Sequence, residues 1–196
     1  MEYISDILFM ISNGLLIPVI LLLLFFLVKS LAIAIGFFGD YSRQQKIRRS
    51  VTPALDSLAD GSDIEGELRK LTEVEDSRFM ACVKALMEHR GDEAYCERIV
   101  ANYEVEVQKI LGRSRSLIKF GPMLGLTGTL IPMGPALVGL ASGDIGSMAY
   151  NMQVAFATTV IGMVIAGIGV ATLQVNQRFY ARQMNDLEFI NRKLNQ

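Results

Sequence analysis

Two uncharged windows that follow one another near the C-terminus decide the fold class of this 196-residue chain. The stretch Phe120–Gln177 reads FGPMLGLTGTLIPMGPALVGLASGDIGSMAYNMQVAFATTVIGMVIAGIGVATLQVNQ, and Asp144 is the single charged residue in it. On each side of Asp144 the uncharged run exceeds the roughly 18 residues that mark a bilayer-spanning helix. The connection Ser142–Gly146 is short and rich in small residues, which favours a tight turn. The sequence therefore predicts a hairpin of two transmembrane helices over residues 120–177.

A third uncharged window lies at the start of the chain. Ile7–Val28 would cover about 33 Å as a helix, which is enough to cross the hydrocarbon core of a bilayer. Leu31–Phe38 continues the apolar pattern, so residues 1–38 are predicted to form the first transmembrane helix. No Lys or Arg precedes the window, which is atypical of a cleaved signal peptide. We therefore expect this helix to be retained as an anchor.

Charged residues are concentrated between the first and second spans. Residues 39–119 hold 14 of the 19 Lys and Arg residues, whereas the segment before span one and the loop between spans two and three hold none. Since Lys and Arg are enriched in cytoplasmic loops, we expect an outer N-terminus, a cytoplasmic helical domain over 39–119 and a cytoplasmic C-terminal helix over 178–196. The predicted fold is an all-α membrane protein with three transmembrane helices and long helices extending from the membrane into the cytoplasm.

Helical periodicity is visible in the charged region, and no strand pattern competes with it. Glu75–Arg90 is predicted to form one helix that ends at Gly91, and a shorter helix is predicted over Asp63–Val74. Asp92 is typical of an N-cap for a further helix, which meets no helix-breaking residue before Gly121 and Pro122. We expect that helix to run without interruption into the second span.

Residues suited to catalysis or metal binding are few. His89 is the only histidine, and Cys82 and Cys96 lie seven residues on either side of it, about 10.5 Å along a helix and too far for shared metal ligands. Phosphate-binding glycine loops, serine elbows and HExxH motifs are absent from the sequence. A net charge of −1 and a pI near 5.9 lack the basic footprint of a nucleic-acid-binding protein. We expect no enzyme activity, no metal, no cofactor and no nucleic acid.

The three windows contain no Asp, Glu, Lys, Arg or His. Proteins that carry ions normally have an ionisable residue within the membrane, so an ion-carrying acid is expected to come from another chain. Any single threonine is more often a packing residue whose hydroxyl bonds its own helix, but threonines on both adjacent spans favour a polar pathway. The polar residues of spans two and three are Thr127, Thr129, Asn151, Gln153, Thr158, Thr159, Thr172 and Gln174.

Glycines are dense on the same two spans. Because glycine lets helix backbones approach closely, these spans are expected to contact other helices and to hold a homo-oligomer together. The glycines are Gly121, Gly125, Gly128, Gly134, Gly139, Gly162, Gly167 and Gly169.

Two short motifs carry a resemblance to a known family. Leu124–Leu130 reads LGLTGTL and resembles the LGLLGTV signature of the MotA/TolQ/ExbB proton channel family. Gln153–Thr158 reads QVAFAT and is similar to the segment of the third span that reads EALLAT in ExbB. The likeness covers roughly Gly121 to Tyr180, and the three-span topology is that of ExbB and TolQ.

The resemblance implies roles for individual polar residues. Thr129 and Thr158 correspond to the pore threonines of the second and third spans. Gln153 stands where ExbB has glutamate, which removes the native carboxylate of that pore, and Thr127 stands where the signature has leucine. Together with Thr159, these residues are expected to line the ion pathway.

The resemblance also implies a function and partners. The expected function is that of the channel-forming subunit of a proton- or sodium-driven motor complex, which converts an ion gradient into movement of a partner subunit. The expected assembly is a homopentamer in the plasma (inner) membrane around single-span ExbD/TolR/MotB-like partners, each with an aspartate in its span. The alternative is a non-conducting oligomeric membrane scaffold, whose spans pack through glycine around a dry axis.

Overall fold

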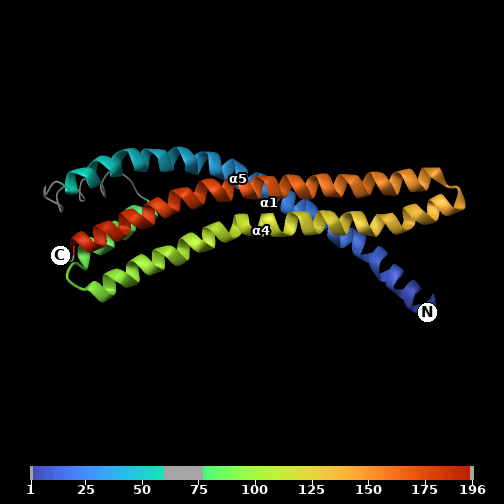
Figure 1. Ribbon diagram of the computed structural model, residues 1–196, viewed down its shortest axis with the longest axis horizontal. Helices are drawn as coiled ribbons and strands as arrows, with labels where there is room; N and C mark the ends of the chain where they lie inside the picture. Colours follow the sequence, from blue (N-terminus) through green and yellow to red (C-terminus); the bar gives the residue numbers. More distant parts are fainter. Residues whose placement is uncertain (1, 60–76, 195–196) are drawn as a thin grey trace. The chain divides into compact units, whose positions relative to one another are not determined.

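The computed structural model describes residues 2–59 and 77–194, and the regular structure in these residues is entirely helical (Figure 1). The helices are α1 (Glu2–Ala59), α3 (Arg78–Glu88), α4 (Glu93–Ser142) and α5 (Ile145–Leu194). The prediction of an all-helical chain is confirmed for this part of the protein. The short helix predicted over Asp63–Val74 lies outside the described residues.

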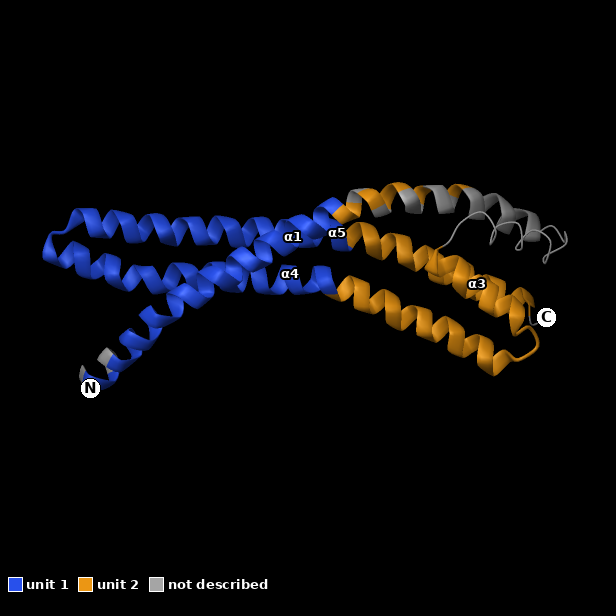
Figure 2. Ribbon diagram, turned by 180° about the vertical axis from the view of Figure 1, so that it is seen from behind, with its two compact units in different colours: residues 1–35, 113–173 blue, residues 36–112, 174–196 orange. Residues whose placement is uncertain are grey.

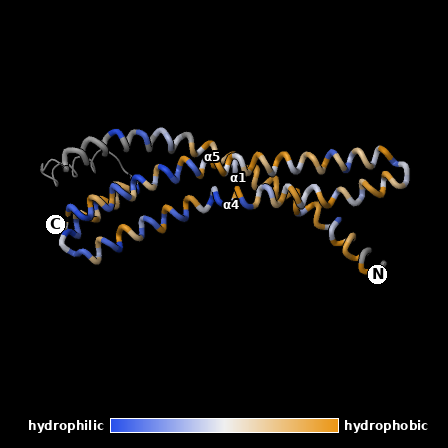
Figure 3. Tube along the Cα trace, viewed as in Figure 1, coloured by the Kyte–Doolittle hydropathy of each residue, from blue (hydrophilic) through white to orange (hydrophobic). Residues whose placement is uncertain are grey.

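Three of these helices are long and apolar enough to cross a membrane. The segment Ile7–Phe37 of α1 has a mean hydropathy of 2.8, and α4 and α5 each contain an apolar window of the same kind. Figure 3 shows the apolar stretches along the traces of α1, α4 and α5. The three predicted spans are therefore confirmed as helices of suitable length and composition.

Helix α4 is continuous from Glu93 to Ser142. It passes through Lys119, as the sequence predicted, and through three internal prolines at Pro122, Pro132 and Pro135. Each proline removes one backbone hydrogen bond, because its nitrogen carries no hydrogen for the carbonyl four residues earlier. The helix nevertheless continues, since in a membrane-spanning segment neighbouring groups can accommodate the freed carbonyls.

Helix α1 is longer than the sequence analysis predicted. The expected span ended at Phe38, but the helix continues to Ala59 through the charged residues that follow. Gly36 and Gly39 lie on either side of the expected end, and a Cβ added at either would meet nothing within 4 Å. These glycines weaken helix propensity without ending the helix, so they are not the boundary that a glycine-rich stretch normally suggests.

The start of α3 also corrects the prediction. The helix begins at Arg78 rather than Glu75, because Ser77 adopts an extended conformation and its Oγ accepts a hydrogen bond from the Met80 N–H at 3.2 Å. This is the geometry of a serine N-cap. The helix ends at Glu88 with His89 as its C-cap, short of the predicted end at Arg90. Gly91, whose φ of 92° is readily available only to glycine, lies in the turn that follows.

Helix α4 begins with the expected cap. The Asp92 carboxylate accepts a hydrogen bond from the Tyr95 N–H at 3.0 Å. Asp144 does the same for α5, since its side chain accepts from the Ser147 N–H at 3.0 Å. Gly143, with a φ of 76°, makes the turn between α4 and α5. The predicted αα-hairpin is therefore present, and each helix start is fixed by an aspartate.

The chain divides into two compact units, to each of which α1, α4 and α5 contribute a part (Figure 2). Unit 1 comprises residues 1–35 and 113–173. Its core joins Leu23 of α1, Leu117 of α4 and Ile165 of α5, all at most 1% exposed. These contacts pack the first span against the hairpin in this unit.

Unit 2 comprises residues 36–112 and 174–196. The apolar face of α3 supplies much of its buried surface, with the predicted stripe residues Phe79, Val83 and Leu86 all buried. The Tyr103 hydroxyl of α4 donates a hydrogen bond to the side-chain oxygen of Gln183 on α5. Burial raises the pKa of Tyr103 well above its ordinary range, so this phenol stays protonated and remains a donor.

The environment of Cys82 gives a test of this packing. Burial, with a smaller contribution from the Glu106 carboxylate, raises the pKa of the Cys82 thiol from 9.0 to about 11. Because the thiolate is the reactive form, iodoacetamide at pH 8 is expected to modify Cys82 at least about ten-fold more slowly in the folded protein than in denaturant. Mass spectrometry of a Cys96→Ser variant, which leaves one thiol, would measure this rate.

The same pKa shift predicts a pH dependence of stability. Since the folded pKa lies above the unfolded value of 9.0, the neutral thiol stabilises the fold below pH 9. This contribution is lost as the pH rises toward about 11. Equal alkylation rates in folded and unfolded protein would contradict the burial of Cys82.

Candidate functional site

The candidate site lies on the α4–α5 hairpin of unit 1, where the two helix backbones approach closely. A Cβ added at Gly162 would lie 2.6 Å from the Gly121 carbonyl oxygen and 2.9 Å from the Gly125 Cα. A Cβ at Gly121 would in turn lie 2.7 Å from the Gly162 carbonyl oxygen. Backbone atoms cannot move aside as side chains can, so only glycine fits at these positions.

Buried residues on both helices follow a spacing of three and four that the sequence analysis missed. Such spacing is typical of two helices packed at a small crossing angle, with one seam of each helix facing the other. The signal was present in the sequence, because small residues recur seven residues apart on both spans. The buried residues are Ala155, Thr158, Gly162, Ile165, Gly169 and Thr172 on α5, and Ser114, Leu117, Gly121, Gly125 and Gly128 on α4.

Thr158 packs directly against Gly128 in this seam. A Cβ added at Gly128 would lie 2.7 Å from the Thr158 Cβ and 2.8 Å from its Oγ1. The Thr158 side chain is only 5% exposed, and its hydroxyl donates to the Ala155 carbonyl at 2.9 Å. Thr129 follows Gly128 directly in α4. Thr129 and Thr158 therefore lie at nearly the same position along the hairpin axis, which is called the threonine level below.

The other polar residues expected at the site are more exposed. Thr129 is partly exposed, and its hydroxyl donates to the Leu126 carbonyl at 2.6 Å. Thr127 is exposed, and its hydroxyl donates to the Met123 carbonyl at 2.8 Å. Gln153 is exposed and Thr159 is partly exposed in the single chain. The structure thus brings Thr158 and Thr129 to one level, while Thr127 and Gln153 lie on open surface of the hairpin.

A second pair of hydroxyls lies on the same seam. The Ser114 and Thr172 oxygens are 3.1 Å apart, and both side chains are buried. Thr172 also donates to the Ile168 carbonyl at 2.8 Å, which uses its single hydrogen, so Ser114 donates to Thr172. This interhelical bond fixes the register of α4 and α5 at a second point, about four helical turns from the Gly128–Thr158 contact.

Most hairpin glycines are accounted for by contacts within the chain. Gly121, Gly125 and Gly128 approach α5, and Gly134 approaches the ring of Phe9 on α1. Gly167, by contrast, has nothing within 4 Å of a Cβ added to it. Glycine density therefore explains the packing of unit 1, and it is no longer an argument for contacts between subunits.

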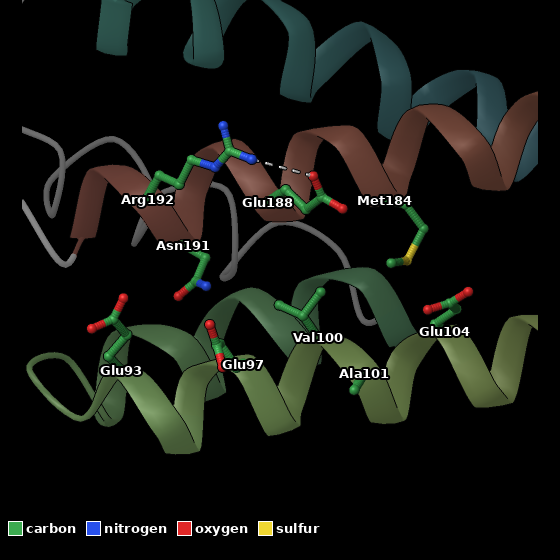
Figure 4. Close-up of a pocket in the computed structure, with 9 residues that line it drawn as sticks. All are labelled: Glu93, Glu97, Val100, Ala101, Glu104, Met184, Glu188, Asn191 and Arg192. Atoms are coloured by element: carbon green, nitrogen blue, oxygen red, sulfur yellow. Dashed lines mark ion pairs between the residues drawn. The ribbon is translucent and has the colours of Figure 1, made fainter.

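A surface pocket of about 520 Å³ lies in unit 2, between α4 and α5 (Figure 4). It is acidic, with one ion pair, Arg192–Glu188 at 3.9 Å, and a further three carboxylates from Glu93, Glu97 and Glu104 of α4. The carboxylates are exposed, as expected of a solvated surface. Among residues 2–59 and 77–194 there is no group of three or more His, Cys, Asp or Glu side chains arranged to hold a metal ion.

The fold and the hairpin define a class of protein. Three helices are long and apolar enough to cross a membrane, and two of them pack through a seam that contains glycines, apolar residues and three hydroxyl side chains, Ser114, Thr158 and Thr172. The chain is therefore a helical membrane protein in which spans two and three pack closely and bury the polar side chain of Thr158 between them.

Comparison with family models identifies the class more closely. Residues 70–188, more than half of the chain, match the MotA/TolQ/ExbB proton channel family. The chain belongs to this family, which is a family of channels rather than of enzymes. Neither the curated proteins nor the solved structures contain a match to the chain.

Proposed function

We propose that this protein is the channel-forming subunit of an ion-driven motor complex, which converts a proton or sodium gradient into movement of a partner subunit. The observation that carries the proposal is the packing of Thr158 against Gly128, the neighbour of Thr129 in α4, between two apolar helices within the region matched by the family. These two threonines would line the ion pathway, with Thr127, Gln153 and Thr159 beside them.

The absence of ionisable residues from the uncharged windows supports a partner that brings the acid. Proteins of this family form channel complexes with other membrane subunits. The partner proposed here is a single-span, ExbD/TolR/MotB-like protein with an aspartate in its span. Protonation neutralises that aspartate so that it can leave its polar site, and deprotonation returns it, because a bare charge in hydrocarbon is costly.

The driving force is sufficient for a mechanical step. A gradient of about 150 mV supplies about 3.5 kcal/mol for each charge that crosses the membrane. The proposed orientation has the N-terminus and the α4–α5 turn on the outer side of the plasma (inner) membrane. Residues 39–119 and the C-terminal helix would then lie in the cytoplasm, as the distribution of Lys and Arg indicates.

A homopentamer is the proposed assembly. Large apolar side chains on the hairpin remain exposed in the single chain, so they require lipid or neighbouring copies around them. These residues include Leu126, Leu130, Met133, Leu137, Phe156, Val160 and Met163. A ring of copies would enclose the partner helices on one side and face lipid on the other.

Ion uptake by a reconstituted complex tests the proposal. The chain would be combined in proteoliposomes with a single-span protein that has an aspartate in its span, and proton and sodium uptake would be measured under an imposed membrane potential. We expect uptake that requires both proteins and disappears when the partner's span aspartate is changed to asparagine. Native mass spectrometry of the same complex should count five copies of the chain. A complex of this composition that takes up neither ion would instead be a scaffold.

A further inference from the structure

Aromatic side chains of α1 and α4 meet near one end of the first two spans. The ring centroids of Phe26 on α1 and Phe120 on α4 lie 5.6 Å apart, and both residues belong to unit 1. Phe26 also packs against the buried core of that unit, whereas Phe120 is 41% exposed. The pair therefore ties α1 to α4 and still presents apolar ring surface outside the core.

Two lysines lie next to these rings at the ends of the uncharged windows. Lys29 is the first charged residue after the window Ile7–Val28. Lys119 is the last charged residue before the window that starts at Phe120. Because the contact between the rings brings the ends of both windows to one depth of unit 1, this depth corresponds to the boundary of the hydrocarbon core. Sequence and packing thus agree in placing both lysines where lipid headgroups begin.

The Lys29 ammonium lies against an aromatic face rather than against a carboxylate. Its Nζ is 5.7 Å from the centroid of the Phe26 ring, within the range of a cation–π interaction, and the side chain is partly exposed. In the part of the chain that the structure describes, neither Lys29 nor Lys119 forms an ion pair. The ring attracts the ammonium without neutralising its charge, so both lysines can attract an anion.

The charges of unit 1 are separated between the two ends of its spans. Arg113 and Arg115 add two cations within two turns of Lys119 on α4. The acidic residues in the sequence of unit 1 lie near the other ends of the same spans, and they are Glu2, Asp6 and Asp144. The end that carries Lys29 and Lys119 therefore has a charge complementary to an anion.

We propose that Phe26, Lys29, Lys119 and Phe120, called the lysine–phenylalanine surface below, bind an anionic phospholipid. The headgroup phosphate pairs with the Lys29 ammonium, Lys119 adds to the attraction, and an acyl chain covers the exposed ring surface. A phospholipid matches both parts of this surface, because its chains are apolar and its headgroup meets the cations at the membrane boundary. The bound lipid would stabilise the contact between span one and the hairpin.

A second copy of the chain is a less suitable occupant. In a ring around the membrane normal, neighbouring copies place the same residues at the same depth. A neighbour would therefore approach this surface with its own span boundaries, where the charged residues next to the uncharged windows are again basic: Lys29, Lys119 and Arg178. Like charges repel, so charge favours the lipid.

Lipid binding to the purified chain in mild detergent tests the site without a partner subunit or an ion gradient. Native mass spectrometry would count bound phosphatidylglycerol. Phosphatidylcholine is the comparison, since it has a phosphate and the same chains but no net charge. We expect Lys29→Gln to weaken phosphatidylglycerol binding about five-fold, as for one cation near an anionic lipid, and to leave phosphatidylcholine binding unchanged. Thermal unfolding without added lipid should match wild type, which shows that the variant is folded.

Matched variants separate the site from a general attraction between charges. Lys109→Gln makes the same change at an exposed position ten residues before Lys119 in α4. That position is about 15 Å further along the helix, beyond the Debye length of about 8 Å, so binding should stay within about two-fold of wild type. Lys29→Arg keeps a cation over the ring and should also bind within about two-fold. Equal losses in Lys29→Gln and Lys109→Gln would overturn the site.

Three other results would also contradict the proposal. The first is equal binding of both lipids, or wild-type binding of phosphatidylglycerol by Lys29→Gln. The second is stabilisation by inorganic phosphate alone as large as that by phosphatidylglycerol, because the acyl chains would then have no part in binding. The third is a change in the number of copies without a change in bound lipid, which would assign the lysine–phenylalanine surface to a neighbouring copy.

The site goes beyond the proposed function and is tested separately from it. Phe120 lies nine residues before Thr129 in α4, about 13 Å along the helix from the threonine level. Loss of the lipid site with normal ion uptake would leave the channel function in place. A complex that takes up neither ion but still loses phosphatidylglycerol in Lys29→Gln would support the lipid site and contradict the channel function.

Discussion

Thr158→Val is expected to reduce ion uptake and partner movement by about ten- to a hundred-fold while the complex still assembles. Valine has nearly the shape of threonine, so the contact with Gly128, where a Cβ would lie 2.7 Å from the Thr158 Cβ, is retained. The variant loses only the buried Thr158 Oγ1. An ion at this position would then lack a polar contact, and burying a charge without one is costly in free energy. The change therefore isolates the hydroxyl from the packing.

Matched variants complete this test. Thr158→Ser keeps the oxygen and should retain most of the uptake. Thr172→Val removes a hydroxyl that is equally buried and also bonds its own helix, two heptads further along the same seam. It is expected to lower stability, because Ser114 loses its acceptor, but to leave the ion selectivity and uptake per complex unchanged. Wild-type uptake in both Thr158→Val and Thr129→Val would mean that these hydroxyls only bond their own helices.

The sequence predicted the hairpin well because its determinants are local. Uncharged windows of spanning length and the small residues at Ser142–Gly146 give both helices and the turn between them. The end of α1 was not predicted, since the residues after Phe38 carry neither a clear apolar stripe nor a stop signal. The cap at Ser77 was overlooked for a related reason: charged residues before it also suit a first helical turn.

The site was predicted only in part, because its geometry depends on the register of two helices. The threonines Thr129 and Thr158 were found by resemblance to the family, but their common level depends on the contact between Gly128 and Thr158. Which atoms donate and which accept depends on the rotamer of each threonine, and no sequence pattern specifies it.

Which helix the hairpin glycines contact could not be predicted from the sequence, for the same reason. A glycine-rich span predicts close approach to some helix, but not to which one. In the structure Gly121, Gly125 and Gly162 are used by α4 and α5 against each other. The subunit contacts of the proposed ring must therefore come from the exposed apolar faces of these helices, and substitutions in the seam should act on each chain before they act on the ring.

Gly162→Ala is expected to destabilise the hairpin by about 3 kcal/mol or more and to prevent assembly. The added methyl would lie 2.6 Å from the Gly121 carbonyl oxygen, 2.9 Å from the Gly125 Cα and 3.2 Å from the Gly125 nitrogen. All three are backbone atoms, so the clash cannot be relieved by a rotamer change, and the helices must separate along the seam. Separation would also remove Thr158 from Gly128 and open the Ser114–Thr172 bond.

Gly167→Ala is the matched control, because it makes the same change five residues later in α5 at a position with nothing within 4 Å. Alanine favours the helix over glycine by about 0.5–1 kcal/mol, so this variant should be as stable as wild type or slightly more. Thermal unfolding in mild detergent and native mass spectrometry would measure stability and assembly of both variants. If Gly162→Ala unfolds and assembles like Gly167→Ala, α4 and α5 do not make the close backbone contact described here. Thr129 and Thr158 would then not share one position along the hairpin axis either, because both statements depend on the same register.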